Sequence, residues 1–400
     1  MKKKLSIFAL SFFLISCGIQ SNSQSNLINN SSLLNANNVS KNTKKAKWTL
    51  MVYIAGDNDL EEYVVKDIEN ELGLMGSTEN VQVTTIADRI NGYDKSRGDW
   101  KTTKLYHVTK GMKADAESAV ADLGEKNTGD PKTLIDFVKW SKEKYPAENY
   151  ALFMWGHGWN WHPGFTMEDK TNKDALDPDE VKSSLSSLGQ IDLIAYDGCN
   201  MASIEVEALW VNHAKAIVHS QEFVDWDGLE YETIIKKLNE NPNIDAYKLA
   251  IIANQSASVN KEKTGSAIAL DDRWSIMLKA VDEWSIALKT GLSKYKKNYD
   301  TAFKASQSFI DAPDDKDLYD MAFQINKNVN DSVIKQKSQN LMKAIKNATL
   351  DEWHIKSEYP NVHGITISKV KSNDEYKEYY KKSEFAKMTN WDEFLDLYKL

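Results

Sequence analysis

Short apolar runs, each ended by a polar turn, recur through the first two thirds of this 400-residue chain. The run Trp48–Ala55 (WTLMVYIA) is rich in β-branched and aromatic residues and stops at Gly56. Similar runs cover residues 81–87, 104–108, 150–155, 191–196, 214–219 and 266–270. Continuous apolar runs of this length are typical of strands that are buried on both faces.

Helical patterns separate several of these runs. Asp130-Pro131 starts one helix with proline at its first position, and residues 178–188 and 201–210 predict two more. Asp59 and Glu62 have capping-box spacing and predict a helix directly after the first strand. Strands that alternate with helices indicate an α/β fold, a mostly parallel sheet with helices on both faces.

The pattern becomes mainly helical after Asp272. Residues 273–289 and 334–348 carry helical apolar spacing, and residues 362–368 predict one late strand, which either returns to the main sheet or belongs to a separate lobe. We therefore expect one large domain over residues 48–272, which would hold the catalytic residues, and a mainly helical region over residues 273–400.

The first residues of the chain predict a targeting signal. Residues 1–16 combine the basic Lys2–Lys4 with a short apolar stretch, and Leu14-Ile15-Ser16-Cys17 resembles a bacterial lipobox. That resemblance implies a lipoprotein signal peptide, a lipid on Cys17 and a location in the bacterial cell envelope. An ordinary secretory signal and a membrane anchor are the alternatives. Residues 17–47 are rich in Ser and Asn, which predicts a flexible tether.

The charge of the chain bears on its partners. Removal of residues 1–16 would take away three lysines and change the net charge from −8 to −11. An acidic chain is a poor candidate for binding nucleic acid, so none is expected.

Two reactive side chains follow apolar runs. His157 lies in MWGHGW between Gly156 and Gly158, and Cys199 follows the strand IDLIAY through an Asp197-Gly198 turn. A helix over 201–210 would place Cys199 near a helix N-terminus, which favours the thiolate. A thiol and an imidazole at neighbouring strand ends predict nucleophilic catalysis, whereas burial as a small apolar residue is the alternative for a lone Cys.

A metal at His157 is not expected. His162 follows five residues later, but Cys or Asp ligands at a suitable spacing are missing nearby, so the sequence predicts no zinc site.

The set WTLMVYIAGDNDLE, MWGHG, YDGCNMASIEV and SQEFVDWDG resembles the clostripain family of cysteine peptidases, which has a caspase-like fold. The likeness covers most of residues 48–272 and is weaker beyond. It implies an endopeptidase that cuts after Arg or Lys through a Cys-His dyad and an acyl-enzyme. Cys199 would be the nucleophile and His157 its acid/base partner, and the backbone amides of Gly158 and Cys199 would form the oxyanion hole.

The resemblance also implies how a basic substrate residue is held. Asp197 and Asp227 match acidic positions of the specificity pocket, and Glu222 is expected to line the same cleft. Turn formation is the alternative for both aspartates. Some relatives cut themselves after a basic residue between the His and the Cys, and Lys170 and Lys173 are the candidates here, without a choice between them.

The chemistry needs no cofactor, but some relatives need calcium. Asp57, Asn58, Asp59 and Glu61 are rich in oxygen, although helix capping explains them equally well and EF-hand spacing is absent. We expect a monomer that binds proteins or peptides with basic residues, and the membrane through the lipid on Cys17. The competing hypotheses are an inactive surface lipoprotein that uses the same fold as a binding module and, more weakly, a non-peptidase hydrolase or transferase.

Overall fold

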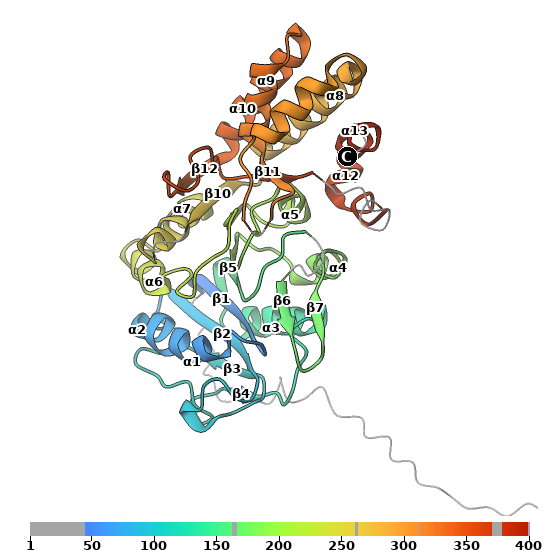
Figure 1. Cartoon of the computed structure of the whole chain (residues 1–400). Helices are drawn as coiled ribbons and strands as arrows, with labels where there is room; N and C mark the ends of the chain where they lie inside the picture. The colour runs from blue at the N-terminus through green and yellow to red at the C-terminus, as the bar shows by residue number, and fades with distance from the viewer. Residues whose placement is uncertain (1–44, 162–165, 261–262, 311, 370–377, 399–400) are drawn as a thin grey trace, which may run out of the picture.

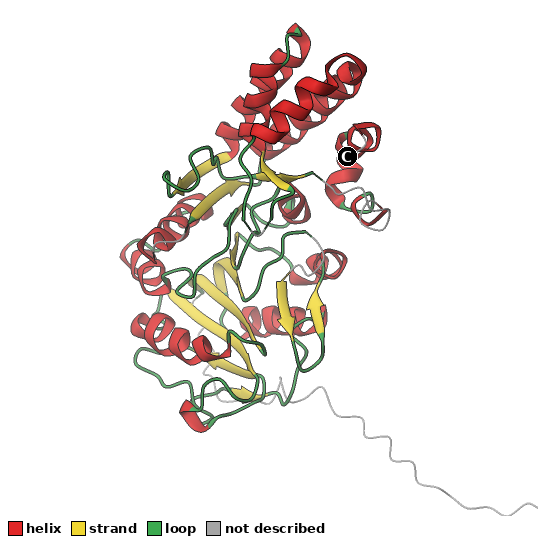
Figure 2. Ribbon diagram, in the orientation of Figure 1, coloured by secondary structure: helices red, strands yellow, loops and turns green. Residues whose placement is uncertain are grey.

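A nine-stranded sheet forms the centre of the computed structural model, which describes residues 45–161, 166–260, 263–310, 312–369 and 378–398. Within these residues the strand order is β12-β10-β9-β8-β5-β1-β2-β3-β4. The five strands from β9 to β2 run parallel, whereas β10 and β12 at one edge and β3 and β4 at the other pair antiparallel. The predicted mostly parallel sheet is therefore confirmed (Figures 1 and 2).

The boundaries of the elements follow. The strands are Ala46–Gly56 (β1), Val81–Arg89 (β2), Lys104–His107 (β3), Ala121–Asp122 (β4), Ala147–Trp155 (β5), Thr166–Asp169 (β6), Asp174–Leu176 (β7), Leu193–Asp197 (β8), Ala216–His219 (β9), Thr264–Ala269 (β10), Asp315–Asp317 (β11), Thr349–His354 (β12) and Thr366–Ser368 (β13). The α-helices are Glu61–Asp67 (α1), Gly73–Met75 (α2), Pro131–Lys144 (α3), Pro178–Leu188 (α4), Ile204–Trp210 (α5), Tyr231–Glu240 (α6), Ala246–Ala257 (α7), Asp272–Ala305 (α8), Leu318–Asn328 (α9), Ser332–Ala348 (α10), Glu384–Met388 (α12) and Trp391–Tyr398 (α13).

The alternation of side chains along β1 explains the two layers of helices. Successive residues of a strand point to opposite faces of its sheet. Met51 and Tyr53 pack in one apolar cluster with residues of α3, α4 and α5, whereas Leu50 and Val52 pack in a second cluster with residues of α1, α6 and α7. Because both faces of β1 are covered, the run must be apolar throughout, and helices lie on both sides of the sheet as predicted (Figure 1).

The C-terminal third is mainly helical, as predicted. The 34-residue helix α8 packs against α9, α10 and α13, and Trp284 of α8 stacks on Trp391 of α13 with ring centroids 5.6 Å apart. The predicted late strand corresponds to β13, which pairs with β11 in a small sheet of its own. An edge strand that the sequence analysis did not find, β12, joins the main sheet beside β10.

The predicted signal peptide, Cys17 and nearly all of the tether lie outside the described residues, and β1 begins at Ala46. Among the helices that the structure describes, none is both long enough and apolar enough to span a bilayer.

Candidate active site

The two reactive residues meet at the carboxyl end of the parallel strands. Trp155, the last residue of β5, pairs with Asp197, the last residue of β8. His157 and Cys199 each lie two residues beyond this pair, and both line one cavity of about 270 Å³. The thiol and the imidazole therefore face one cavity, because parallel strands bring their carboxyl ends to one edge.

The turn after β5 fits tightly against Cys199. A Cβ atom on Gly158 would lie 2.8 Å from the backbone nitrogen of Cys199 and closer still to its carbonyl oxygen. Only glycine at position 158 allows the two backbones this approach.

Cys199 is not at a helix N-terminus, which corrects the sequence-based prediction. Helix α5 begins at Ile204 rather than at residue 201, and its N-cap is Ser203. The intervening amides of Asn200 and Ala202 donate instead to the carbonyls of residues 222 and 220, which delays the helix. The backbone N–H of Val224 donates to Cys199 Sγ at 3.3 Å, a contact that replaces the expected helix dipole.

His157 has a carboxylate partner that the sequence analysis assigned to another task. Its Nε2 lies 3.0 Å from Oδ1 of Asp59, and Nζ of Lys170 lies 2.9 Å from the same oxygen. The predicted capping box is wrong, because α1 begins only at Glu61, its N-cap is Leu60, and no side chain caps it. Burial opposes ionisation of Asp59, but the hydrogen bonds from Lys170 and His157 prevail and lower its pKa to about 2.

Asp197 contributes a buried carboxylate to the cavity. Its Oδ1 accepts from the backbone N–H of Leu229 at 3.1 Å, and its Oδ2 accepts from the hydroxyl of Tyr231 at 2.9 Å. The residue is only 6% exposed, and Gly228, with a positive φ of 52°, passes so close that a Cβ there would collide with the carboxylate. Burial raises the pKa of Asp197 to about 6, although both hydrogen bonds act in the opposite direction.

The walls of the cavity are largely aromatic. Tyr63, Trp155, Phe223 and Trp226 line it, and Trp226 stacks on Tyr63 with ring centroids 5.3 Å apart. Asp225 adds a second carboxylate to the lining, an exposed residue that the sequence analysis missed because it chose Asp227 from the same DWD motif.

The other two predicted acidic residues lie elsewhere. Asp227 is exposed and pairs with Lys66 at 2.5 Å, outside the described residues that line the cavity. Glu222 is fully buried, and its Oε2 accepts from the hydroxyl of Tyr359 and the backbone N–H of Ile310, each at 2.8 Å. Glu222 therefore ties the loop after β9 to the C-terminal region, and the expectation that it lines the cleft is wrong.

Comparisons with known proteins agree with this geometry. The family model described as the clostripain family matches residues 52–398. This chain belongs to the clostripain family. Clostripain from Hathewaya histolytica is 26% identical over 229 residues, which is 50% of this chain and 43% of that protein. The chain therefore matches less than half the length of that curated relative.

Solved structures of similar proteins share the fold. A secreted C11 cysteine protease from Bacteroides thetaiotaomicron, in complex with an irreversible peptide inhibitor, matches with a TM-score of 0.67 at 18% identity, over 86% of this chain and 99% of that one. An inactive zymogen C11 protease from Parabacteroides distasonis matches with a TM-score of 0.63 at 18% identity and the same coverage. The caspase-like fold expected of a clostripain-family chain is confirmed.

The two candidate processing sites of this clostripain-family chain lie in the turn between β6 and β7. Lys170 is held by its ion pair to Asp59 and by a bond from its backbone N–H to the carbonyl of Asp57 at 2.8 Å. Lys173 is exposed and has a positive φ of 57°. Neither belongs to the described residues that line the cavity.

The four oxygen-rich residues after β1 do not form one cation site. The side-chain oxygen of Asn58 accepts from the backbone N–H of Leu60, and Glu61 forms an ion pair with Arg89. Asp57 alone turns toward other carboxylates, those of Asp88, Glu125 and Asp169. His162, the second histidine considered for zinc, lies outside the described residues.

Proposed function

We propose that this chain is a cysteine endopeptidase that cleaves peptide bonds after Arg or Lys. The observation that supports it most is the single cavity that holds a thiol, an imidazole with a carboxylate partner, and a buried carboxylate. Each of these groups has a distinct task in acyl transfer to sulfur.

The reaction would proceed in two halves. Sγ of Cys199 attacks the carbonyl carbon of the scissile bond while His157 accepts the thiol proton. The C–N bond then breaks, His157 returns that proton to the leaving amine, and a thioester remains on Cys199. Water, deprotonated by His157, attacks the thioester, and the acid product leaves as the thiol is restored.

Asp59 would orient His157. An ionised carboxylate only accepts hydrogen bonds, so Nε2 must carry the proton that points at Asp59. Nδ1 of the neutral ring is then the nitrogen that accepts the proton of Cys199. The backbone N–H groups of Gly158 and Cys199, two residues whose backbones approach each other closely, would stabilise the oxyanion.

The carboxylate of Asp197 would bind the positively charged side chain of the substrate residue that precedes the scissile bond. The aromatic walls of the cavity suit the apolar stem of Arg or Lys. The carboxylate of Asp197 replaces the water that the cation loses when it enters the cavity. Asp225 would add to the negative potential at the mouth of the cavity. Asp227 is less suited to this role, because Lys66 already neutralises it.

We further propose self-processing in the turn between β6 and β7 and anchoring of the chain outside the cytoplasm through a lipid on Cys17. Both lysines are exposed, but Lys173 is the better cleavage site, because the side chain of Lys170 is held by its ion pair with Asp59.

The test is the variant Cys199→Ala, assayed with fluorogenic peptides that end in Arg or Lys, beside the wild type with and without a thiol alkylator. Turnover should disappear in the variant and in the alkylated enzyme, and mass spectrometry should find the turn cleaved in the wild type only. Undiminished turnover by the variant would remove Cys199 from the mechanism. Tight peptide binding by a wild type without turnover would instead identify a binding module.

A further inference from the structure

Both exposed tryptophans of the described chain lie beside the active site. All twelve tryptophans belong to the described residues, and among them only Trp159 and Trp226 are at least half exposed, at 50% and 55%. Trp226 lines the cavity that holds Asp197, whereas Trp159 is not among the described residues that line it and lies next to His157. A single exposed apolar residue needs no explanation, but the placement of both at one site indicates contact with a substrate.

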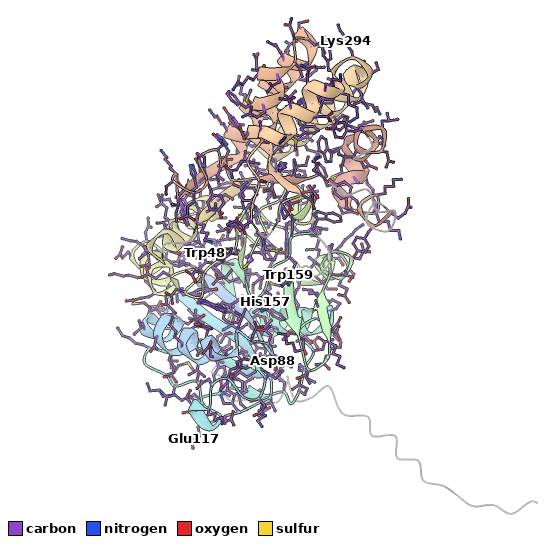
Figure 3. All side chains as sticks on the ribbon, in the orientation of Figure 1. Trp48, Asp88, Glu117, His157, Trp159 and Lys294 are labelled. Atoms are coloured by element: carbon purple, nitrogen blue, oxygen red, sulfur yellow. The ribbon has the colours of Figure 1, made fainter. Side chains whose placement is uncertain are left out.

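The side chain of Trp159 lies against the imidazole of His157. The two ring centroids are 6.0 Å apart, and the ring planes are inclined by 30°. Figure 3 shows the two side chains next to each other near the middle of the molecule. His157 is itself fixed by its contact with Asp59 at 3.0 Å. The indole therefore borders the position at which the imidazole acts.

The turn that carries Trp159 is held by buried contacts of the residues that follow it. Asn160 has a positive φ of 64°, which asparagine tolerates better than most residues, and it is only 5% exposed. Its Oδ1 accepts from the hydroxyl of Ser203 at 2.6 Å, and its Nδ2 donates to Asp315. Trp161, the next residue, is only 2% exposed. The chain therefore turns at Asn160, and the backbone is anchored directly after Trp159 while its indole stays in contact with solvent.

The proposed reaction determines which part of a substrate passes Trp159. The basic side chain before the scissile bond would enter the cavity toward Asp197. The nitrogen that leaves must come within about 3 Å of the imidazole of His157 to accept its proton. The residue after the scissile bond carries that nitrogen, so its side chain starts beside His157. From there it can reach an indole whose ring centroid is 6.0 Å from the imidazole.

We propose that Trp159 binds the substrate residue after the scissile bond and selects an uncharged aromatic or large aliphatic side chain there. This inference rests on the proposed function. An indole offers an aromatic ring stacked or edge-to-face contact, and it offers an aliphatic chain apolar area. A basic side chain can also stack on indole. Lys170, however, already places a cation at Asp59, beside the imidazole, which disfavours a second cation.

The test uses the full-length enzyme and two internally quenched peptides. They are identical except for the residue after a single arginine, which is phenylalanine in one and alanine in the other. The wild type should cleave the phenylalanine peptide with a kcat/KM about tenfold higher, because one aromatic contact contributes about that factor. In Trp159→Ala the ratio of the two kcat/KM values should fall to near one. Trp159→Phe, which keeps an aromatic ring, should retain most of the preference.

A second measurement separates binding after the scissile bond from formation of the acyl-enzyme. An added amine can replace water: its nitrogen attacks the thioester carbon, the C–S bond breaks, and a proton of the amine passes through His157 to the sulfur of Cys199. Phenylalanine amide should intercept the thioester about tenfold more efficiently than alanine amide in the wild type. The two amides should be equally efficient in Trp159→Ala. Mass spectrometry of the ligated and hydrolysed products gives the ratio.

The matched control is Trp226→Ala, which removes an equally exposed tryptophan on the side of the cavity. This variant should raise KM for both peptides alike and leave their kcat/KM ratio as in the wild type, because Trp226 would contact the residue before the scissile bond. Since the indole of Trp159 is half exposed, the Tm of Trp159→Ala should stay within about 2 °C of the wild type.

Two results would overturn this inference alone. One is a wild type that cleaves both peptides with equal kcat/KM. The other is a Trp159→Ala variant that loses activity equally on both peptides and keeps the wild-type ratio, since Trp159 would then only support His157. A wild type that binds the peptides but cleaves neither would instead refute the proposed function, and this inference with it.

Discussion

The substitution Asp197→Asn tests most directly whether the carboxylate of Asp197 makes the enzyme prefer a positively charged substrate residue. Asparagine keeps the size of the side chain. Its amide oxygen can still accept from the backbone N–H of Leu229, and its amide nitrogen can donate to the hydroxyl oxygen of Tyr231, the two groups that hold the carboxylate in the wild type. The substitution removes the negative charge of residue 197 from the cavity. The paired substrates should be peptides that end in arginine or in citrulline, which has nearly the same shape but no charge.

The expected size of the effect follows from the burial of Asp197. A pair of opposite charges about 4 Å apart interacts by about 4 kcal/mol at an effective dielectric constant of about 20. Removing one member of a buried, hydrogen-bonded charge pair costs about 2–5 kcal/mol. We therefore expect the arginine-to-citrulline ratio of kcat/KM to fall by a factor of about 30 to 900, which corresponds to about 2–4 kcal/mol. The citrulline substrate alone should change by less than about threefold.

The pH dependence of the same ratio gives a second, independent measure. With a pKa of about 6, Asp197 is mostly protonated at pH 5 and mostly ionised at pH 7. The ratio of kcat/KM, which reports the free enzyme, should then rise about tenfold over this interval in the wild type and stay flat in Asp197→Asn. Any pH dependence that the two substrates share cancels in the ratio.

Stability supplies the control for folding. The pKa of Asp197 is raised on folding, so its contribution to stability is full below the unfolded pKa and is lost as pH rises through about 6. The Tm of Asp197→Asn, measured against the wild type, should therefore increase between pH 5 and pH 7.

Asp227→Asn should leave the substrate ratio unchanged. The assignment of Asp197 to substrate charge selection would be refuted by either of two results. They are an arginine-to-citrulline ratio of kcat/KM that does not change with pH in the wild type, and a ratio in Asp197→Asn equal to that of the wild type.

Two further predictions concern the imidazole and the backbone beside the thiol. Asp59→Asn should lower kcat about tenfold or more with little change in KM, since the imidazole loses the carboxylate that orients it; an unchanged kcat would leave Asp59 no part in positioning His157. Gly158→Ala should lower kcat/KM at least a hundredfold in a folded protein, because its Cβ would collide with backbone atoms of Cys199. Wild-type turnover by this variant would show that the close approach is unnecessary.

Local sequence predicted the strands of the parallel core well. Most were nearly continuous apolar runs because both faces of the sheet are covered, and such a pattern needs no knowledge of partners. The ends of β5 and β8 then placed His157 and Cys199 at one edge. The edge strand β12 escaped notice, since its residues are only partly buried and lack a continuous apolar run.

Helix starts were predicted less well near the active site. Asp59 has the spacing of a capping residue, and Cys199 precedes a helical pattern, but long-range partners decided both positions. His157 and Lys170 engage the carboxylate of Asp59, and carbonyls of the loop after β9 engage the amides that follow Cys199. Contacts with residues far along the chain outweigh local propensity at such points.

By itself, the sequence determined that a thiol and an imidazole follow neighbouring strands and at which edge of the sheet they gather, because apolar periodicity and strand direction are local properties. Only the tertiary structure decided the surroundings of each acid. Asp197 lines the cavity, Asp59 contacts His157, Glu222 is buried against Tyr359, and Asp57 lies among other carboxylates. The environment of a carboxylate is set by the loops that fold around it, and those loops come from distant parts of the chain.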